Sequence, residues 1–556
     1  MMKKIYKLFY IVGFINIGFM MSCSEDILDT KPLNGYSDVD VFSDASLLRN
    51  YVNGAYGTFR TPFRDENTFT DGLTDNAYNQ HGSAEAQVRR YNQGEVTRDN
   101  GESVTFSLWY HSYTYIRRAN LFFEQIQGSP INENELTTMK GEMHFIRAYN
   151  YFQLLSWYGG VPLITDTFEL GQDSYSVDRS SIEETVAFIV EELDMAISQL
   201  PSKSSVLDGR ASMEAAMALK GRTLLYAASP LFNESGDQSK WQAAMEANRE
   251  VMDLSSVSLV DMDNWGPMFR GENDQEVIFR RQYSQQNNQG YGVNVWLFPN
   301  SNGGWATITP TQDLVDSFEL VTSGELPEES PSYNPQEPYE NRDPRFYETI
   351  LYNGASFKDG TYDPYLDKQE PDNQDLAGLD SRISPISPHN ASRTGYNFLK
   401  WSQPSVGEFD GNTGPYIFFR KTEFYLNYAE AQIELGNEEE ARNAINEVRR
   451  MREMPDINTS GQELMEEYRN ETRVEFVLED HRFFDIRRWM IADEVLDDPA
   501  MGVEVFRLSD GSFEYNYDFT TQANRQWVDR QYFLPIPFEE IQRSGGAIEQ
   551  NPGYQQ

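Results

Sequence analysis

Cysteine is almost absent from this sequence. Cys23 is the only one among 556 residues, so an internal disulfide framework and a cysteine-rich metal site are both excluded. Histidine is scarce too, and its five positions show no HExxH or other ligand spacing. We expect structural or solvent-exposed roles for all of them: His81, His111, His144, His389 and His481. The sequence therefore predicts no cofactor and no metal site built from these residue types.

Positive charge is also in short supply. The chain has 46 Lys and Arg against 87 Asp and Glu, a formal net charge of −41. A field of this sign repels polyanions, which argues against nucleic acid as a partner and against attachment to an anionic membrane through a basic patch. For the same reason, sulfated or uronate-rich polysaccharides are less expected as ligands than neutral ones.

Sequence motifs of common enzymes are missing. There is no GxSxG, no Walker loop and no GxGxxG after a strand. The most charged segment, residues 469–489, read as a helix, places Glu471, Glu475 and Glu479 on successive turns. A glycosidase would use two carboxylates as acid and base, but carboxylates four residues apart with arginines between them are typical of an ion-pair ladder. We expect a structural helix here and no enzymatic activity, with these rings buried: Phe476, Phe483, Phe484 and Trp489.

A loop at residues 372–381 carries alternating carboxylates, DNQDLAGLDS. Oxygen ligands of this kind suit Ca²⁺, so a structural calcium ion is one interpretation. The loop lacks the full spacing of an EF-hand, however. A solvated loop without metal is the favoured interpretation.

No stretch after the N-terminal segment reaches eighteen apolar residues, so a later membrane-spanning helix is not predicted. The N-terminus itself has a basic region containing Lys3, Lys4 and Lys7, followed by an apolar run over residues 8–21. That run is too short to span a bilayer stably and is typical of a signal peptide.

Cys23 follows directly after this run and after Ser22. A small residue and then cysteine is the pattern of a bacterial lipoprotein signal, in which the chain is cut before the cysteine and the thiol is acylated. We therefore predict a signal peptide over residues 1–22 and lipidation of Cys23, with the lipid as sole anchor. The alternative is an ordinary signal peptide with an incidental cysteine. Met20 and Met21 match the residues usual before such a cleavage site poorly.

Helical periodicity dominates from residue 104 to 252 and returns at 424–452. In the later stretch Gly436 lies at the turn of a helix pair whose small and large apolar residues are spaced as in a tetratricopeptide repeat. Residues 215–226 with 241–252 form a second candidate pair. Ser180 and Glu183 have the spacing of a capping box. The predicted fold is mostly α, with tetratricopeptide-type helix pairs as a scaffold.

Two segments are rich in loop residues and aromatics, and we expect ligand-reading loops there. The first covers residues 64–103 and the second roughly 255–420. Sugars are bound by flat rings that stack on their apolar faces and by planar polar groups that bond to their hydroxyls. The candidates from the first segment are Asp65, Asn67, Asp71, Asp75, Asn76 and Tyr78. Those from the second are Tyr291, Trp296, Trp305, Arg393, Tyr396 and Trp401.

Trp109 is a further candidate near the start of a helix beside the first loop. Its helical spacing with Tyr113 and Ile116 favours a place in the core. For any one of the candidate rings, packing inside the protein is the competing interpretation.

Seven segments in this order resemble the SusD/RagB family of outer-membrane nutrient-uptake lipoproteins of Bacteroidetes. They include RAYNYFQLLSWYGGVPLIT at 147–165, NRDPRFYETI at 341–350 and ETRVEFVLEDHRFFDIRRW at 471–489. The others are CSEDILDTKP at 23–32, PTQDLVDSFE at 310–319, YLNYAEAQIELGN at 425–437 and YFLPIPFEEIQRSGGAIEQNPGY at 532–554. Each is modest alone, whereas the ordered set covers nearly the whole mature chain.

The resemblance implies a SusD-like fold in which a helical scaffold (23–255, with closing helices late in 256–556) carries a loop-rich binding part in 256–556. It implies a protein without enzymatic activity that captures oligosaccharide or polysaccharide and delivers it to a SusC-like TonB-dependent transporter. It also implies attachment to the outer membrane facing the cell exterior, with SED after Cys23 similar to the acidic export signal of these lipoproteins. A member that binds peptide or another non-glycan nutrient is the alternative, and a surface glycoside hydrolase is the third hypothesis.

Overall fold

The structure, a computed structural model, describes residues 38–66, 68–81, 84–168, 175–284 and 291–555. The predicted signal peptide, Cys23 and Asn67 lie outside the described residues. The described chain is mostly helical, with eleven short strands in the part that it describes. Within the same ranges, no helix combines the length and apolarity needed to cross a bilayer.

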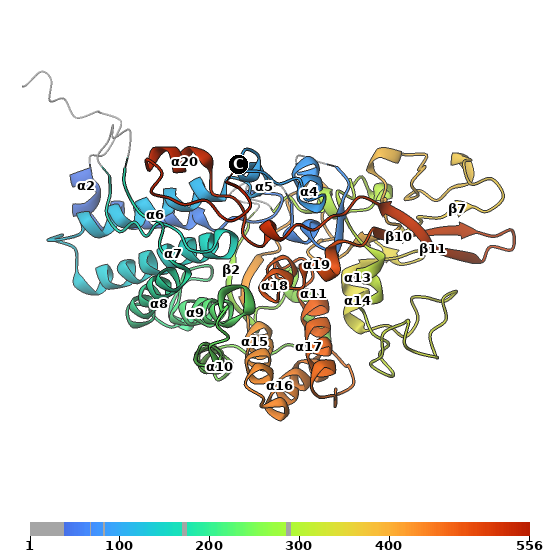
Figure 1. Ribbon diagram of the computed structural model, residues 1–556. Helices are drawn as coiled ribbons and strands as arrows, with labels where there is room; N and C mark the ends of the chain where they lie inside the picture. Colours follow the sequence, from blue (N-terminus) through green and yellow to red (C-terminus); the bar gives the residue numbers. More distant parts are fainter. Residues whose placement is uncertain (1–37, 67, 82–83, 169–174, 285–290, 556) are drawn as a thin grey trace, which may run out of the picture.

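The helices divide into an early and a late group along the chain (Figure 1). The early ones are α2 (Asp38–Ser43), α3 (Ala45–Ala55), α4 (Glu85–Asn92), α5 (Gly101–Val104), α6 (Leu108–Gln125), α7 (Glu133–Tyr158), α8 (Ile182–Gln199), α9 (Met213–Ala228), α10 (Gln238–Met252) and α11 (Met262–Phe269). The late ones are α12 (Asn294–Leu297), α13 (Gln312–Asp316), α14 (Pro344–Thr349), α15 (Lys421–Glu434), α16 (Glu438–Met451), α17 (Gln462–Glu475), α18 (Arg482–Arg488), α19 (Ala492–Leu496) and α20 (Phe538–Arg543).

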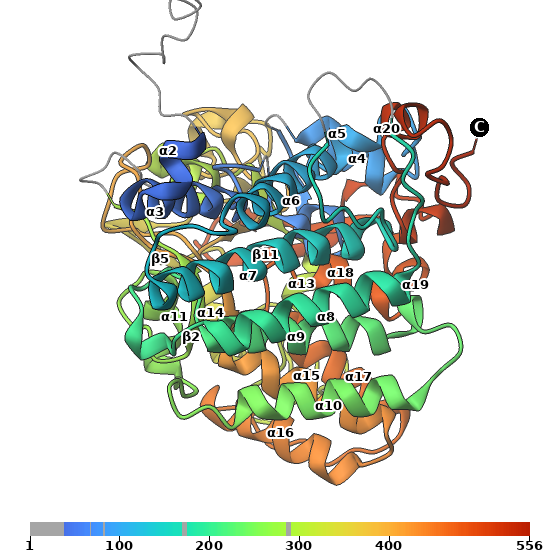
Figure 2. The same ribbon diagram turned by 90° about the vertical axis from the view of Figure 1, so that its left-hand side faces the viewer.

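One continuous stack of antiparallel helices forms the scaffold. α6 packs on α7, α7 on α8, α8 on α9, α9 on α10, and α10 on α15, which in turn packs on α16 and α17. Figure 2 shows α7, α8, α9 and α10 lying side by side. The stack therefore continues directly from α10 to α15, although about 170 residues separate them in sequence. Both predicted helix pairs, α9 with α10 and α15 with α16, are confirmed.

Small residues allow the helices of this stack to approach closely. Gly221 of α9 faces Asn248 of α10, and a Cβ at Gly221 would lie 2.8 Å from the Asn248 side-chain oxygen. Asn248 instead donates a hydrogen bond to the Gly221 carbonyl at 3.1 Å. Ala429 and Ala441 are fully buried where α15 packs on α16. Such small-on-large packing gives paired repeat helices a shared core.

The capping box of α8 is shifted by one residue from the predicted position. Ser181, not Ser180, precedes the helix, and its hydroxyl accepts the backbone N–H of Glu184 at 3.1 Å. The Glu184 carboxylate accepts the backbone N–H of Ser181 at 2.8 Å. Because the run SSIEE offers two serines and two glutamates at the same spacing, sequence alone does not fix the register.

Short strands and loops form the second part of the molecule. The strands are β1 (Ala77–Asn79), β2 (Val277–Arg281), β3 (Ile308–Pro310), β4 (Ile350–Leu351), β5 (Ser356–Phe357), β6 (Gly360–Thr361), β7 (Leu366–Asp367), β8 (Asn397–Phe398), β9 (Tyr416–Arg420), β10 (Ala500–Arg507) and β11 (Phe513–Gln522). Of these, β7, β10 and β11 lie on the side away from α8, whereas β2 lies centrally beside α9 (Figure 1). They pair as β1–β3, β2–β9, β4–β8, β5–β6 and the three-stranded β11–β10–β7. Each sheet is small, so the loops between strands set the shape of this part.

The pairing of β1 with β3 joins the two loop regions that we expected from the sequence to bind ligand. The two strands are antiparallel, with Tyr78 opposite Thr309. Gln80 extends the ladder by donating its backbone N–H to the Thr307 carbonyl at 2.9 Å. The first loop segment is thereby fixed beside the second.

Candidate functional site

Three aromatic side chains of the second loop region and one that precedes the first loop lie in contact, and we call them the aromatic platform: Trp296, Trp305 and Phe409 with Phe63. The ring of Trp296 stacks on Phe63 with 5.3 Å between centroids and 13° between planes. Trp305 stands perpendicular to Trp296 at 4.9 Å, and Phe409 lies 6.4 Å from Trp305. Both tryptophans are partly exposed, and Phe409 is 70% exposed. The platform thus presents aromatic surface to solvent.

A closed loop holds the two tryptophans in place. The backbone N–H of Trp305 donates to the Val295 carbonyl, and the N–H of Thr307 donates to the Trp296 carbonyl, both at 2.8 Å. Gly304 lies inside this loop, where a Cβ would come within 2.0 Å of the Phe298 carbonyl oxygen. Only glycine therefore fits at that position, and the glycine pair before Trp305 is a requirement of the loop geometry.

Polar side chains from β1 and its extension lie beside the platform. The Gln80 side chain donates to the Ala391 carbonyl and accepts the backbone N–H of Arg393, both at 2.9 Å. Nε2 of His81 lies 2.6 Å from the Trp305 carbonyl, which accepts its proton. The rings of His81 and His389 stack at 4.9 Å. Burial, together with the cationic Arg393 nearby, lowers the pKa of His81, so its ring is neutral at pH 7.

Arg393 and Tyr78 complete this polar edge. The partly exposed guanidinium of Arg393 has no hydrogen bond or ion pair in the part of the chain that the structure describes. Burial and Glu85 raise the pKa of Tyr78, and Arg393 acts on the same hydroxyl in the opposite direction. A planar donor and a neutral hydroxyl beside exposed rings are the groups that recognise sugar hydroxyls. The structure places the predicted residues in two pairs: Trp296 with Trp305 through their rings, and Tyr78 with Arg393 through their electrostatic interaction. Gln80 and His81 connect the two pairs, because both reach the backbone carbonyl of Trp305.

Other predicted rings are packed inside the protein. Tyr291 is 0% exposed and stacks on Tyr283 at 4.9 Å with 10° between planes. Tyr396 is equally buried and donates its hydroxyl to Gln312 at 2.8 Å. Trp401 is also buried, with its indole N–H donated to the Leu478 carbonyl at 2.9 Å. All three rings are buried, and each stacks on another ring or uses its polar atom in a hydrogen bond inside the core. We therefore remove them from the candidate site.

Trp109 is buried as well. It packs against Tyr113 at 5.0 Å and edge-on against Tyr158 at 5.3 Å. The helical spacing with Tyr113 and Ile116 had favoured this place in the core, and α6 confirms that spacing. Trp109 is therefore not part of the platform.

The polar residues of the first loop mostly hold the fold together. Asp75 is buried between Arg482, at 2.7 Å, and Arg473, at 2.9 Å. Although burial opposes ionisation, these two guanidinium groups hold the pKa of Asp75 well below its usual range. Asn76, fully buried, donates to Asp71 at 2.9 Å. Asp75 and Asn76 therefore leave the candidate site.

Asp65 differs from its neighbours because its side chain is 31% exposed and forms an ion pair with Arg281. It lines a surface hollow of about 500 Å³ together with Arg60 and His111. No interaction among the described residues joins Asp65 to the aromatic platform. The sequence analysis expected Asp65 in a loop, and the structure confirms this. The structure does not join it to the tryptophans.

The platform also contains rings that sequence reasoning missed. Phe63 precedes the first loop, and Phe409 lies in the segment GEFDGNTG, where glycines flank a single exposed ring. An isolated aromatic among loop-forming residues is a usable signal for exposure, because no periodic apolar pattern offers it a core position. Gln80 and His389 gave no such signal.

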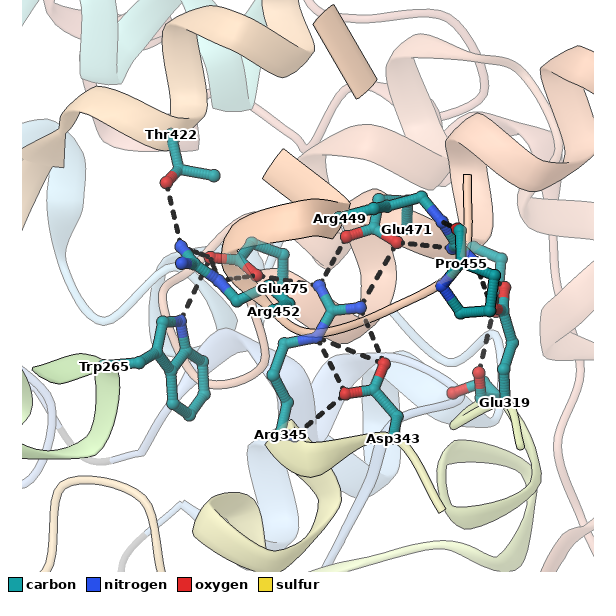
Figure 3. A network of polar contacts seen from close by, with 12 residues as sticks. Trp265, Glu319, Asp343, Arg345, Thr422, Arg449, Arg452, Pro455, Glu471 and Glu475 are labelled. Carbon is teal, nitrogen blue, oxygen red and sulfur yellow. Dashed lines mark hydrogen bonds and ion pairs between the residues drawn. The ribbon is translucent and has the colours of Figure 1, made fainter. Parts of the chain in front are cut away.

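The charged segment 469–489 contributes to a buried ion-pair network. Figure 3 shows Glu471 and Glu475 facing arginines from other elements. Arg345 contacts both carboxylates, and Arg449 donates to Glu471 at 2.9 Å. Arg452 donates to Glu475 at 2.8 Å, and Arg420 at 2.7 Å. The prediction that the interleaved arginines supply the partners was therefore wrong for these two glutamates.

The segment is also not one helix. α17 ends at Glu475, and α18 begins at Arg482 after a turn in which Leu478 and Asp480 have positive φ. The rings Phe476, Phe483 and Trp489 are buried as predicted, whereas Phe484 is only partly buried. Glu471 and Glu475 are 1% and 0% exposed and bound by guanidinium groups, which is the environment of a structural ion pair.

The loop considered for calcium uses its most buried carboxylate elsewhere. Asp380 accepts the backbone N–H of Ser301 at 2.7 Å and that of Asp363 at 3.1 Å. Across the described residues, no group of three or more His, Cys, Asp or Glu is arranged to hold a metal ion. The remaining acidic residues of the loop, Asp372 and Asp375, are exposed.

Comparison with known proteins agrees with this architecture. A model of the SusD family matches residues 275–554, and a second model, described as starch-binding and associating with the outer membrane, matches residues 26–225. The chain is 24% identical to SusD-like protein P38 of Formosa agariphila over 505 residues, covering 87% of this chain and 91% of that protein.

Solved structures show the same similarity. A SusD-like protein from Bacteroides fragilis superposes with a TM-score of 0.76 at 31% identity, covering 94% of this chain and 100% of the other. A SusD-like carbohydrate-binding protein from the same species superposes with a TM-score of 0.75 at 25% identity, covering 91% and 99%. Because the first family model spans half of the chain and the first of these structures almost all of it, this protein belongs to the SusD family.

Proposed function

We propose that this protein binds oligosaccharide or polysaccharide on the aromatic platform. The observation that carries the proposal is the perpendicular pair Trp296 and Trp305, partly exposed, with the exposed ring of Phe409 beside it. An angled pair of rings can hold two consecutive sugar units whose apolar faces are turned relative to each other. Arg393, which donates its backbone N–H to the Gln80 side chain, and Tyr78 next to it supply polar groups that can bond to hydroxyls. Similar proteins are described as carbohydrate-binding and not as enzymes, which supports binding without hydrolysis.

The proposal also covers the cellular location of the protein and its partner. The second family model is described as associating with the outer membrane, and the sequence around Cys23 has the lipoprotein pattern. These two observations support a lipid anchor on Cys23 and a position on the cell exterior. Delivery of the bound glycan to a SusC-like TonB-dependent transporter follows from the family resemblance. Mass spectrometry of the mature N-terminus tests the anchor, and co-purification of the transporter with the protein tests the partnership.

Titration of the purified protein with neutral polysaccharides, an α-glucan, a β-glucan, a xylan and a mannan, tests the binding proposal. We expect saturable binding to at least one of them, without release of reducing ends. Trp305→Ala and Phe409→Ala should each weaken that binding by about 1–3 kcal/mol, the loss seen when a stacked aromatic is removed. Phe168→Ala is the matched control, because Phe168 is an exposed ring outside the platform.

Three results would change the conclusion. Binding that survives both platform substitutions would move the glycan site elsewhere. Binding to none of the polysaccharides, together with retention of peptides, would favour the non-glycan alternative. Release of product would restore the hydrolase hypothesis. Unfolding midpoints equal to that of the unchanged protein show that the variants are folded.

A further inference from the structure

A second pocket lies between α6 and the C-terminal region, and it shares no residue with the aromatic platform. Its volume is about 280 Å³. One wall is a face of α6, and the opposite walls come from residues 162–168, Tyr175 and α20. Pockets of this size with apolar walls are typical of sites for small molecules.

Rings and aliphatic side chains form most of the pocket surface. Trp109, Tyr113 and Ile116 contribute from α6, and Ile164 and Ile548 lie across from them. At the rim, Phe168 is 39% exposed. Its ring stacks on Tyr175 at 5.2 Å with 25° between planes.

Three polar groups inside the pocket have partners in the protein, whereas the charged lining residues Arg117 and Asp166 are exposed. The Tyr113 hydroxyl donates to the Pro162 carbonyl at 2.8 Å, and the Asn120 amide donates to the Ile164 carbonyl at 2.8 Å. The Tyr175 hydroxyl donates to the Glu540 carboxylate. A sugar ring placed here would leave most of its hydroxyls without a partner, which is costly when they leave water. The pocket therefore selects an apolar ring over a sugar.

Charge around the pocket narrows the class further. Burial, followed by Glu540, Glu102 and Glu539, raises the pKa of Tyr110 to about 12. Two carboxylates, Asp166 and Glu540, line the pocket against one cation, Arg117, which disfavours an anionic ligand. Together with the ring-lined walls, this favours an uncharged planar ring.

We propose that this pocket binds a small uncharged aromatic group, such as the aryl substituent of a glycoside. The face of α6 forms the bottom, the Phe168–Tyr175 stack forms one side, and a polar part of the ligand points to the mouth, where Thr114 and Arg117 are exposed. This site is separate from the aromatic platform and does not depend on the function proposed for it.

Phenyl β-D-glucoside is a suitable probe, and methyl β-D-glucoside is its control with the same sugar and no ring. We expect saturable binding of the phenyl compound to the purified protein, with NMR saturation transfer strongest at the phenyl protons, and much weaker binding of the methyl compound. Phe168→Ala should weaken phenyl glucoside about two- to tenfold, the range expected for one lost ring contact. Ile164→Phe, which fills the pocket, should abolish the binding.

Phe409→Ala provides the matched control, since it removes an exposed ring from the platform and leaves the pocket intact. Phenyl glucoside binding should be unchanged in this variant, while polysaccharide binding falls. Equal binding of the two glucosides would overturn the proposal, as would a loss of phenyl glucoside binding in Phe409→Ala with none in Phe168→Ala. Since Phe168 is at the rim, its variant is expected to fold, and an unchanged unfolding midpoint checks this. Failure here leaves polysaccharide titration of the platform variants unaffected, so the two proposals fail separately.

Discussion

At the scale of single residues, Asp71 shows how the interior treats a carboxyl group from the first loop. It is almost fully buried and accepts the side-chain N–H of Asn76 at 2.9 Å and the backbone N–H of Leu478 at 3.3 Å. Its second oxygen has no hydrogen-bond partner among the described residues. Burial raises the pKa of Asp71 to about 7, despite the opposing bond from Asn76. The carboxyl group is thus easier to bury protonated than charged.

The sign of the resulting pH dependence follows from proton binding. An aspartate in the unfolded chain has a pKa of about 3.9. Between that value and about pH 7, the folded state holds a proton on Asp71 that the unfolded state has lost. The free energy of unfolding contributed by this group therefore decreases as pH rises through this window and is constant above it.

Asp71→Asn removes this penalty. We expect the variant to exceed the unchanged protein in free energy of unfolding by about 1–3 kcal/mol at pH 8, with the difference vanishing near pH 4. The gain is smaller than the free energy equivalent to the whole pKa shift, because the amide NH2 group that the substitution introduces is buried without an acceptor. Denaturant unfolding at the two pH values measures it. Asp372→Asn, an exposed carboxylate, is the control and should change nothing; a less stable Asp71→Asn protein at pH 8 would contradict the prediction.

Glu475 lies at the centre of the buried ion-pair network. It is within hydrogen-bond distance of Arg345, Arg420 and Arg452, at 2.7–2.8 Å. Burial opposes its ionisation, but these guanidinium groups hold the pKa of Glu475 well below its usual range. The carboxylate is therefore charged in the folded protein at every pH of biological interest.

Glu475→Gln keeps the shape of the side chain and removes its charge. Three buried guanidinium groups then lose one counter-charge, and we expect the free energy of unfolding to fall by about 3–5 kcal/mol. Glu463→Gln on the exposed side of the same helix should have an effect within about 0.5 kcal/mol. Denaturant titration distinguishes the two. A loss of similar size in both variants would mean that the network contributes no more than a surface charge.

Residue-level prediction succeeded where local sequence determines exposure and failed where a distant partner does. Trp296 and Trp305 are held within one loop, because Trp305 donates its backbone N–H to Val295 and Thr307 donates its N–H to Trp296. Tyr291 is buried because Tyr283 stacks on it and Asn412 bridges to its backbone. The sequence near Tyr291 does not predict that residue 412 packs against it. Aromatic richness thus indicates a segment that contains exposed rings, but it does not indicate which ring faces solvent.

At the scale of elements, substitutions at the N-terminus of α8 test which serine caps the helix. Ser181→Ala removes the hydroxyl that accepts the Glu184 N–H, and we expect a loss of about 1 kcal/mol in the free energy of unfolding. Ser180→Ala should be nearly neutral, because Ser180 lies one residue before the cap. Thermal unfolding of the two variants under the same conditions makes the comparison. The reverse order of effects would restore the register that sequence spacing first favoured.

Helix pairs were predictable because their signals are local, and the break between α17 and α18 was not. Gly436 at the α15–α16 turn has φ of +78°, where glycine is the usual residue. Leu478 and Asp480 also have positive φ, yet neither is glycine. Their conformation is stabilised from a distance, because Asp71 accepts the Leu478 N–H and Thr70 donates to Asp480. A sequence window over 469–489 contains none of these partners.

At the scale of the whole molecule, the fold inserts its loop-rich part into a helical stack. α10 and α15 are adjacent in space, and the residues between them contain β2 to β9 and most of the platform. The first loop then reaches this part through the pairing of β1 with β3. The site is consequently assembled from three stretches that are far apart in sequence, around residues 63–81, 296–305 and 389–409.

The net charge of −41 acts on every ligand that approaches this assembled site. A neutral glycan carries no charge for that field to act on, so its affinity should be the same within twofold from about 0.01 M to 1 M salt, over which the Debye length falls from about 30 Å to 3 Å. An anionic polysaccharide such as alginate should bind more weakly at low salt and gain affinity as the repulsion is screened. Affinity electrophoresis or calorimetry at both salt concentrations measures the two slopes. Arg393, whose guanidinium has no hydrogen bond or ion pair among the described residues, is a local cation at the polar edge and opposes the overall field there. If alginate instead bound more tightly at low salt, and Arg393→Gln removed that dependence, the local cation would outweigh the net charge, and uronate-containing glycans would become the preferred ligands.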